Sequence, residues 1–158
     1  MYAFYYMKPV AYLLCGLPGS GKTTYAKNLE KHEVLRLSLD EELFKRFGRF
    51  AENYQDNEKK TKVSLKELLI QKLQAGTSIV LDYGFWKKSE RDEYKKLVED
   101  NGGEWRLVYF KVSSPVLHER LVVRNVTDSE TNHIITPDLL DMFISQFEEP
   151  HSEREEVY

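Results

Sequence analysis

The stretch Gly16–Thr23 constrains the fold more than any other part of the chain. It reads Gly-Leu-Pro-Gly-Ser-Gly-Lys-Thr and fits the pattern G-x-x-x-x-G-K-S/T at every fixed position. An apolar run, Val10–Cys15, precedes it, and a segment of helical composition, Lys22–Lys31, follows it. This order predicts a buried strand, a turn whose backbone N–H groups form an anion-binding nest, and a helix whose N-terminus adds its positive dipole end.

The residue types of this motif suit the phosphates of a nucleotide. Glycines permit backbone angles and a close approach that side chains would forbid. Lys22 supplies a point charge for the β- and γ-phosphates, and the Thr23 hydroxyl is placed to bind Mg²⁺. An ordinary glycine-rich turn is the alternative, but it does not require the flanking strand and helix. We therefore expect a nucleotide-binding site made by Gly16, Leu17, Pro18, Gly19, Ser20, Gly21, Lys22, Thr23 and Thr24.

Strand patterns alternate with helix patterns along the rest of the chain, which predicts an α/β fold. Three layers, α/β/α, should enclose a mainly parallel sheet. A chain of 158 residues supports one domain, which we expect to span 1–158 with its core at 10–150. The expected strands are Val10–Cys15, Val34–Leu39, Ser78–Leu81 and Trp105–Val112. Four expected helices are Lys22–Lys31, Glu41–Phe47, Lys59–Leu73 (with Gly76 as its C-terminal cap) and Pro137–Phe147. Two more are expected, one that is capped by Ser89 and ends near Asp100, and one that is capped by Ser113 or Ser114 and ends near Arg124. A loop is expected at Ala51–Asn57.

The composition is that of an ordinary globular protein and narrows the choice of partners. Apolar residues make up 41% and charged residues 31%, the net charge is −3, and the pI is about 5.9. A basic surface over the whole domain, of the kind that selects duplex nucleic acid, is therefore disfavoured, although a local patch is allowed. No apolar run is long enough to span a bilayer. Cys15 is the single cysteine, so we expect a reduced, cytoplasmic setting.

Two aspartates follow predicted strands, where the ligands of open α/β sheets gather. Asp40 comes after Leu-Ser-Leu and Asp82 after Ile-Val-Leu, so both should project from the same edge of the sheet as the glycine-rich turn. A carboxylate there can hold Mg²⁺, directly or through water, or accept a proton from an acceptor hydroxyl. Two alternatives stay open, because Asp40 could cap the helix that follows it and Asp82 could serve only the turn.

Five short segments together resemble the small P-loop kinases related to the kinase domain of polynucleotide kinase, to zeta toxins and to chloramphenicol phosphotransferase. They are GLPGSGKTT, LSLDE, IVLDYGFW, ERLVVRN and ITPDLL, and the resemblance covers about Val10 to Pro150. It implies ATP and Mg²⁺ as cofactors and the strand order 2-3-1-4-5. It also implies that Asp82 joins Thr23 as a metal ligand, and that Asp40 is the base that activates the acceptor hydroxyl.

Arg120 and Arg124 share one helical face before the polar stretch Asn125–Thr136. Positive groups that close on a nucleotide stabilise the charge of the transferring phosphoryl group. In the kinases that the chain resembles, such arginines open a mobile lid and contact the phosphates. The resemblance thus implies catalytic roles for Arg124 and Arg120 beside Lys22, and a lid at about 125–136. A solvated basic face paired with Glu119 is the alternative.

Other side chains could either reach the acceptor or only pack. Arg91 is expected to cover the surface of its helix. Packing is also the preferred interpretation for the aromatic residues Phe44, Phe47, Phe50, Tyr54, Phe85 and Trp86. The kinases that the chain resembles usually add a fifth strand after the last helix, whereas only Glu155–Tyr158 could begin one here. Four strands are therefore predicted, in the order 2-3-1-4, and the fifth is left open.

The leading functional prediction is an ATP-dependent phosphotransferase that acts on a hydroxyl acceptor, either a small molecule or a nucleic-acid 5′-end. The alternative is an NTPase, or a nucleotide-triggered switch or interaction module, without a small acceptor; a degenerate nucleotide-binding protein is a third. A GTPase switch is disfavoured because the chain has neither an N-K-x-D guanine signature nor D-x-x-G. A motor of the AAA type is disfavoured because no helical lid domain follows the core.

Overall fold

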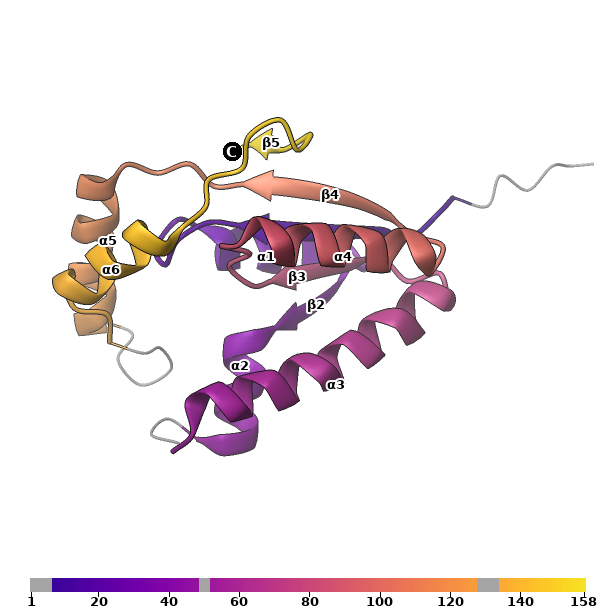
Figure 1. The fold of residues 1–158 in the computed structure, drawn as a ribbon, viewed down its shortest axis with the longest axis horizontal. Coiled ribbons are helices and arrows are strands. Elements are labelled where there is room, and N and C mark those ends of the chain that lie inside the picture. The colour runs from indigo at the N-terminus through magenta and orange to yellow at the C-terminus, as the bar shows by residue number, and fades with distance from the viewer. Residues whose placement is uncertain (1–6, 49–51, 128–133) are drawn as a thin grey trace, which may run out of the picture.

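The computed structural model describes residues 7–48, 52–127 and 134–158. Its five-stranded sheet has the order β2-β3-β1-β4-β5, and every neighbouring pair is parallel (Figure 1). The strands are β1 (Val10–Cys15), β2 (Leu35–Ser38), β3 (Ile79–Asp82), β4 (Glu104–Tyr109) and β5 (Glu156–Val157). The helices are α1 (Lys22–Glu30), α2 (Leu39–Phe47), α3 (Tyr54–Gln74), α4 (Lys88–Asp100), α5 (Ser114–Thr127) and α6 (Pro137–Gln146). The predicted α/β fold is confirmed.

Both faces of the sheet are buried, which explains why its central strands read as continuous apolar runs. Alternate side chains of β1 enter different cores: Leu13 joins one with residues of α3 and α4, and Leu14 joins another with residues of α1. Helices therefore cover both faces, as the predicted three layers require. A third, smaller core between α5 and α6 is centred on Leu121 and Leu140, beside the sheet (Figure 1).

Two helices begin earlier than predicted, because a side chain outside each helix accepts a hydrogen bond from its first turn. Strand β2 ends at Ser38 rather than Leu39, and Ser38 caps α2 by accepting a hydrogen bond from the backbone N–H of Glu41 at 3.3 Å. Asp40 is therefore neither at the strand end nor the cap, but in the first turn of α2. Ser89 does not cap α4, because that helix begins at Lys88, whose N–H donates to Glu148 Oε2 at 2.7 Å.

Helix α3 is longer than its apolar pattern predicts, because it begins at Tyr54 within the segment predicted as a loop. Its C-terminal end does follow the prediction. Gly76 has a φ of 80°, its N–H donates to Leu73 O, and the next N–H, of Thr77, donates to Lys72 O, both at 2.9 Å. These two bonds form a Schellman motif, which glycine favours because its backbone enters the left-handed region without strain.

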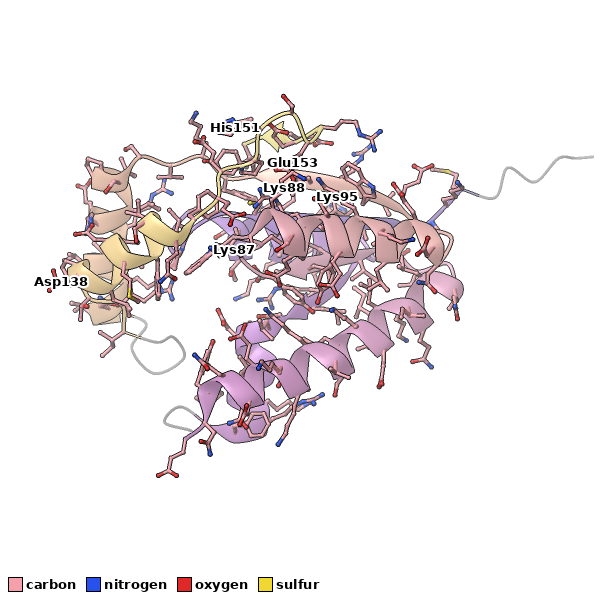
Figure 2. The ribbon with its side chains drawn as sticks, viewed as in Figure 1. Lys87, Lys88, Lys95, Asp138, His151 and Glu153 are labelled. Atoms are coloured by element: carbon pink, nitrogen blue, oxygen red, sulfur yellow. The ribbon has the colours of Figure 1, made fainter. Side chains whose placement is uncertain are left out.

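The segment after α6 supplies the fifth strand that the sequence left open. Two residues, Glu156 and Val157, pair in parallel with β4. Before them, Glu153 is buried against Arg91 and Lys95 of α4 (Figure 2). The expectation that Arg91 covers the helix surface is wrong, because its side chain is 1% exposed. Among the described residues, no helix is both long and apolar enough to cross a membrane.

Candidate active site

The glycine-rich segment forms a tight loop between β1 and α1, as its spacing predicts. Gly19 and Gly21 have φ angles of 80° and 103°, in the left-handed region where a side chain is strained. At Gly16, an added Cβ would lie 2.7 Å from Ser20 Oγ, so the loop closes tightly only with glycine there. The N–H of Gly16 also donates to Gly84 O at 3.0 Å, which ties the loop to the segment after β3. These residues form the cradle expected for phosphate.

Lys22 lies at the centre of the charges that the sequence singled out. Its Nζ donates to Leu17 O at 2.8 Å and lies 3.4 Å from Ser20 Oγ, so the ammonium is folded back over the loop. Burial lowers the pKa of Lys22 to about 8, while the charges of Asp82 and Asp40 oppose this decrease and that of Arg124 adds to it. The fold therefore brings Asp82, Asp40 and Arg124 within electrostatic reach of Lys22.

Thr23 and Asp82, the two predicted metal ligands, meet where α1 begins and β3 ends. Thr23 Oγ1 lies 3.4 Å from Asp82 Oδ1, and Asp82 is 7% exposed at the end of β3. Their hydroxyl and carboxylate oxygens are hard donors that fit Mg²⁺. Within the described ranges, no three His, Cys, Asp or Glu side chains form a metal cluster. Mg²⁺ usually takes one or two protein oxygens and fills its shell with phosphate and water.

Arg36 of β2 is part of this site, although the sequence analysis did not select it. Its Nε and Nη2 donate to Asp82 Oδ2 at 3.1 and 2.8 Å. Its Nη1 and Nη2 also donate to the two carboxylate oxygens of Glu41, both at 2.9 Å. The signal in the sequence was a charged residue within the otherwise apolar strand pattern Val-Leu-Arg-Leu-Ser-Leu.

Asp40 lies exposed in the first turn of α2, the helix that follows the edge strand β2. Its charge acts on Lys22, as described above, and on Tyr54 at the start of α3. Burial raises the pKa of Tyr54 to about 12, and the charge of Asp40 adds to that increase. Phe44, Phe47 and Tyr54 are 45%, 37% and 47% exposed, so each is only partly packed. Phe50 lies outside the described residues.

The two arginines of α5 both approach the loop. Arg120 Nη1 donates to Gly19 O at 3.1 Å, and Leu121 packs against the position where Gly19 would carry a Cβ. Arg124 is half-buried, and its Nε has no hydrogen-bond partner in the described part of the chain. Arg120 therefore contacts the loop, and the charge of Arg124 acts on Lys22, so neither arginine belongs only to a solvated surface.

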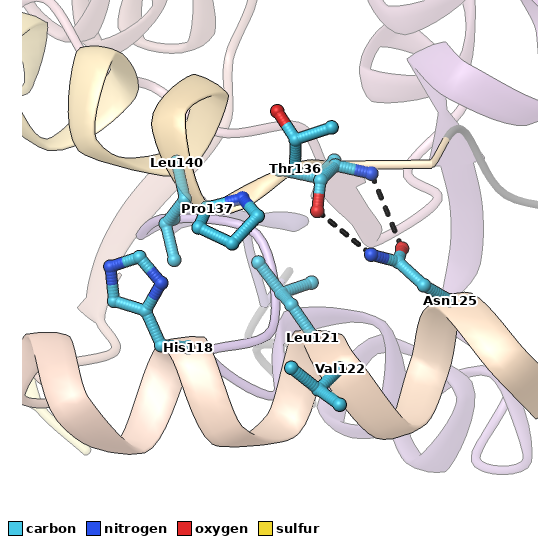
Figure 3. A pocket seen from close by; sticks show the side chains of 8 residues that line it. His118, Leu121, Val122, Asn125, Thr136, Pro137 and Leu140 are labelled. Carbon is cyan, nitrogen blue, oxygen red and sulfur yellow. Dashed lines mark hydrogen bonds between the residues drawn. The ribbon is translucent and has the colours of Figure 1, made fainter.

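The base of the predicted lid is closed by a side-chain amide. Helix α5 runs to Thr127, three residues past its predicted end, so the lid at 125–136 is helical where it begins. Asn125 Nδ2 donates to Ile135 O at 2.8 Å, and Ile135 N donates to Asn125 Oδ1 at 3.2 Å (Figure 3). The cavity beside this clamp is about 20 Å³, too small for a nucleotide. Residues 128–133 of the lid lie outside the described residues.

The aromatic residues after Asp82 pack, as preferred from the sequence. Phe85 is 2% exposed and lies against the rings of Tyr83 and Tyr94. Trp86 packs on Phe143 of α6, with ring centroids 4.8 Å apart, and its Nε1 donates to Gly16 O at 3.3 Å. Trp86 therefore supports the loop through Gly16, whereas Phe85 belongs to the core.

Comparisons with known proteins agree on family and fold. The profile of an AAA domain family matches residues 12–150. Among curated proteins, none matches the chain. A candidate kinase from Chloroflexus aurantiacus superimposes with a TM-score of 0.75 at 18% identity, over 96% of this chain and 88% of that one. A gluconokinase from Sinorhizobium meliloti gives a TM-score of 0.65 at 18% identity, over 96% and 82%.

A third similar structure belongs to a larger assembly. A chain of the Pnkp1/Rnl/Hen1 RNA repair complex gives a TM-score of 0.74 at 17% identity, over 91% of this chain but only 45% of that one. At such identities the likeness concerns the fold. The profile match covers most of the chain, and the loop, strand order and structural neighbours agree with it. The chain therefore belongs to this AAA domain family and has the fold of the small P-loop kinases.

Proposed function

We propose that the protein is an ATP-dependent phosphotransferase that moves the γ-phosphate of ATP to a hydroxyl group. The observation that supports this most is the 3.4 Å contact of Thr23 Oγ1 with Asp82 Oδ1, beside the loop that carries Lys22. One hydroxyl and one carboxylate oxygen meet where a magnesium ion on the β- and γ-phosphates would bind. When bound, that ion would offset the charge of the phosphates.

The remaining charged groups suit the other parts of phosphoryl transfer. Lys22 would exchange its carbonyl partner for phosphate oxygens, and Arg124 and Arg120 would add positive charge from α5. Asp40, on the acceptor side, would accept the hydroxyl proton. The acceptor oxygen then bonds to the γ-phosphorus, the bond from that phosphorus to the bridging oxygen breaks, and ADP leaves.

The acceptor class and location are narrower proposals. The acceptor would be a small molecule or a nucleic-acid 5′-end, in a cytoplasmic setting. The net charge of −3 makes a nucleic-acid acceptor less favoured than a small molecule. The exposed aromatic side chains Phe44, Phe47 and Tyr54 near Asp40 could contact either kind of acceptor.

The test is transfer of radiolabel from the γ-phosphate of ATP to a panel of metabolites and oligonucleotides. We expect the wild type to label at least one acceptor, and Lys22→Ala to lose both labelling and Mg·ATP binding. Asp40→Asn should lose labelling but keep Mg·ATP binding, because Asp40 serves the acceptor. Asp138→Asn is the matched control, since Asp138 is also the exposed second residue of its helix, α6, but lies away from the sheet (Figure 2).

Two outcomes would contradict the proposal. Normal labelling by Asp40→Asn would remove Asp40 from its role as the base. Release of inorganic phosphate by the wild type, with no acceptor labelled, would favour the alternative of an NTPase or a nucleotide-dependent switch.

A further inference from the structure

A buried arginine stands behind the carboxylate of the proposed metal site. The Arg36 side chain is 7% exposed and that of Asp82 is 4% exposed. Arg36 lies within β2, the edge strand, and Asp82 ends the neighbouring strand β3, where it is the register partner of Ser38. Two charged groups lose most of their hydration here, and this cost is offset only by close, well-directed hydrogen bonds.

The hydrogen bonds of Asp82 are divided between its two oxygens. Both donors of Arg36 contact Oδ2, at 3.1 and 2.8 Å, whereas Thr23 contacts Oδ1 at 3.4 Å. When a carboxylate is held through one of its oxygens, its second oxygen points in a fixed direction. In this chain, that second oxygen faces the hydroxyl of the nucleotide-binding loop.

A second carboxylate fixes the arginine itself. Glu41 receives two hydrogen bonds from Arg36, each at 2.9 Å, and the ion pair with Arg36 lowers the pKa of Glu41. Glu41 lies in the first turn of α2, next to Asp40. The guanidinium is thereby held from two sides, by β3 and by the beginning of α2.

We propose that Arg36 is a positioning residue that turns Oδ1 of Asp82 toward the magnesium ion of the bound nucleotide, with Glu41 holding Arg36 in place. This inference rests on the proposed function, since it assigns a role within the same site. Arg36 would not touch ATP or the metal. Groups that orient a metal ligand in this way commonly change metal affinity by about 10- to 100-fold when they are removed.

The sign of the effect separates positioning from simple charge neutralisation. A guanidinium close to a metal site repels the metal ion, so if Arg36 only neutralised Asp82, its removal would strengthen Mg²⁺ binding. If Arg36 orients Asp82, its removal weakens Mg²⁺ binding despite the lost repulsion. A merely structural role would reduce stability and leave the contribution of Mg²⁺ unchanged.

The experiment compares ATP binding by calorimetry with and without Mg²⁺, in the wild type and in Arg36→Met. We expect the ratio of the two affinities to fall about 10- to 100-fold in Arg36→Met, while the affinity for metal-free ATP stays the same. Arg36→Lys should restore part of the ratio, because an ammonium can still donate to Oδ2. Arg46→Met is the matched control, since Arg46 pairs with Glu42 on the same helix and contacts Ser64 rather than Asp82.

An unchanged or increased ratio in Arg36→Met would overturn the inference while leaving the proposed function intact. If Arg36→Met does not fold, Glu41→Gln takes its place, because this change loosens Arg36 but leaves Asp82 paired with it. A smaller decrease in the ratio of the two ATP affinities is then expected. If that ratio does not decrease, the inference is overturned. If the wild type binds Mg·ATP no better than metal-free ATP, both the inference and the proposed metal site are overturned. If the wild type binds Mg·ATP but labels no acceptor, that result counts against the proposed function alone.

Discussion

Two buried arginine–carboxylate pairs have nearly the same donors and distances but serve different ends. Arg36 reaches Asp82, and Arg91 reaches Glu153, each through Nε at 3.1 Å and Nη2 at 2.8 Å. Arg36 places both donors on a single oxygen, whereas Arg91 spreads them over both. Lys95 adds a third bond to Glu153 at 3.0 Å. The first pair leaves an oxygen for the nucleotide site, and the second leaves none.

The closed pair acts on the architecture around the site rather than on ligands. Glu153 joins the C-terminal segment to α4, next to the short strand β5 (Figure 2). The third nitrogen of Arg91, Nη1, donates to Phe85 O at 2.9 Å, in the segment that follows Asp82. The difference lies in which groups bond each oxygen. One oxygen of Asp82 is bonded only by Thr23 of the nucleotide-binding loop, which points to chemistry, whereas both oxygens of Glu153 are bonded by α4, which points to structure.

The largest expected effect comes from breaking the closed pair. Arg91→Met leaves Glu153 buried with only Lys95 beside it, and should lower the free energy of unfolding by about 3–5 kcal/mol. Urea denaturation measures this loss. The double variant Arg91→Met with Glu153→Met should recover much of it, because no buried charge is left alone. If Arg91→Met lost little stability but changed the Mg²⁺ dependence of ATP binding, the distinction between the two pairs would be wrong.

The same pair should make stability sensitive to acid. Burial raises the pKa of Glu153, but the hydrogen bonds and charges of Arg91 and Lys95 outweigh it and hold the pKa at about 2, below the ordinary 4.5. A carboxylate with a depressed folded-state pKa stabilises the fold above its unfolded-state pKa, and this contribution is lost as the pH falls toward the folded-state value. Between about pH 6 and about pH 2, Glu153 should account for a loss on the order of 3 kcal/mol in the free energy of unfolding.

Denaturation at several pH values, in the wild type and in Glu153→Gln, checks this contribution. The variant should start less stable at neutral pH but lose less on acidification, so the two curves converge. Parallel curves would show that Glu153 does not titrate in the way its partners suggest.

The smallest effect on stability is expected at the open oxygen. Thr23→Val removes one long hydrogen bond to Asp82 Oδ1 and should change the free energy of unfolding by less than about 1 kcal/mol. It should nevertheless weaken the contribution of Mg²⁺ to ATP binding by about tenfold or more, because it removes a proposed metal ligand. Thermal melting and calorimetry measure the two quantities. A large loss of stability with normal Mg²⁺ dependence would mean that this contact, too, is structural.

The geometry of the proposed nucleotide-binding loop could be predicted because its information is local. The loop from Gly16 to Thr23 needs particular residues at fixed spacing, and the strand before it begins and ends where the apolar run does. The strand order came from the resemblance to known kinases and is confirmed. Asp82 is predicted correctly at its strand end because the pattern Ile-Val-Leu-Asp is equally local.

The parts that sequence reasoning missed depend on side chains that meet from distant segments. Nothing near Arg36 indicates that Asp82 is its partner 46 positions away, and nothing near Arg91 indicates Glu153. The beginning of α4 was misplaced for the same reason, since its first N–H is bonded by Glu148 of the C-terminal segment. The sequence predicts Asp40 as a strand end because it does not reveal that Ser38, two residues earlier, caps α2.

The most direct measurement is calorimetric titration of the wild type and of Lys22→Ala with Mg·ATP. The account holds that the loop amides and the Lys22 ammonium together bind the triphosphate. It predicts saturable binding to the wild type and a loss of that binding in a folded Lys22→Ala variant. Equal binding by both proteins, or no binding by the wild type, would contradict it.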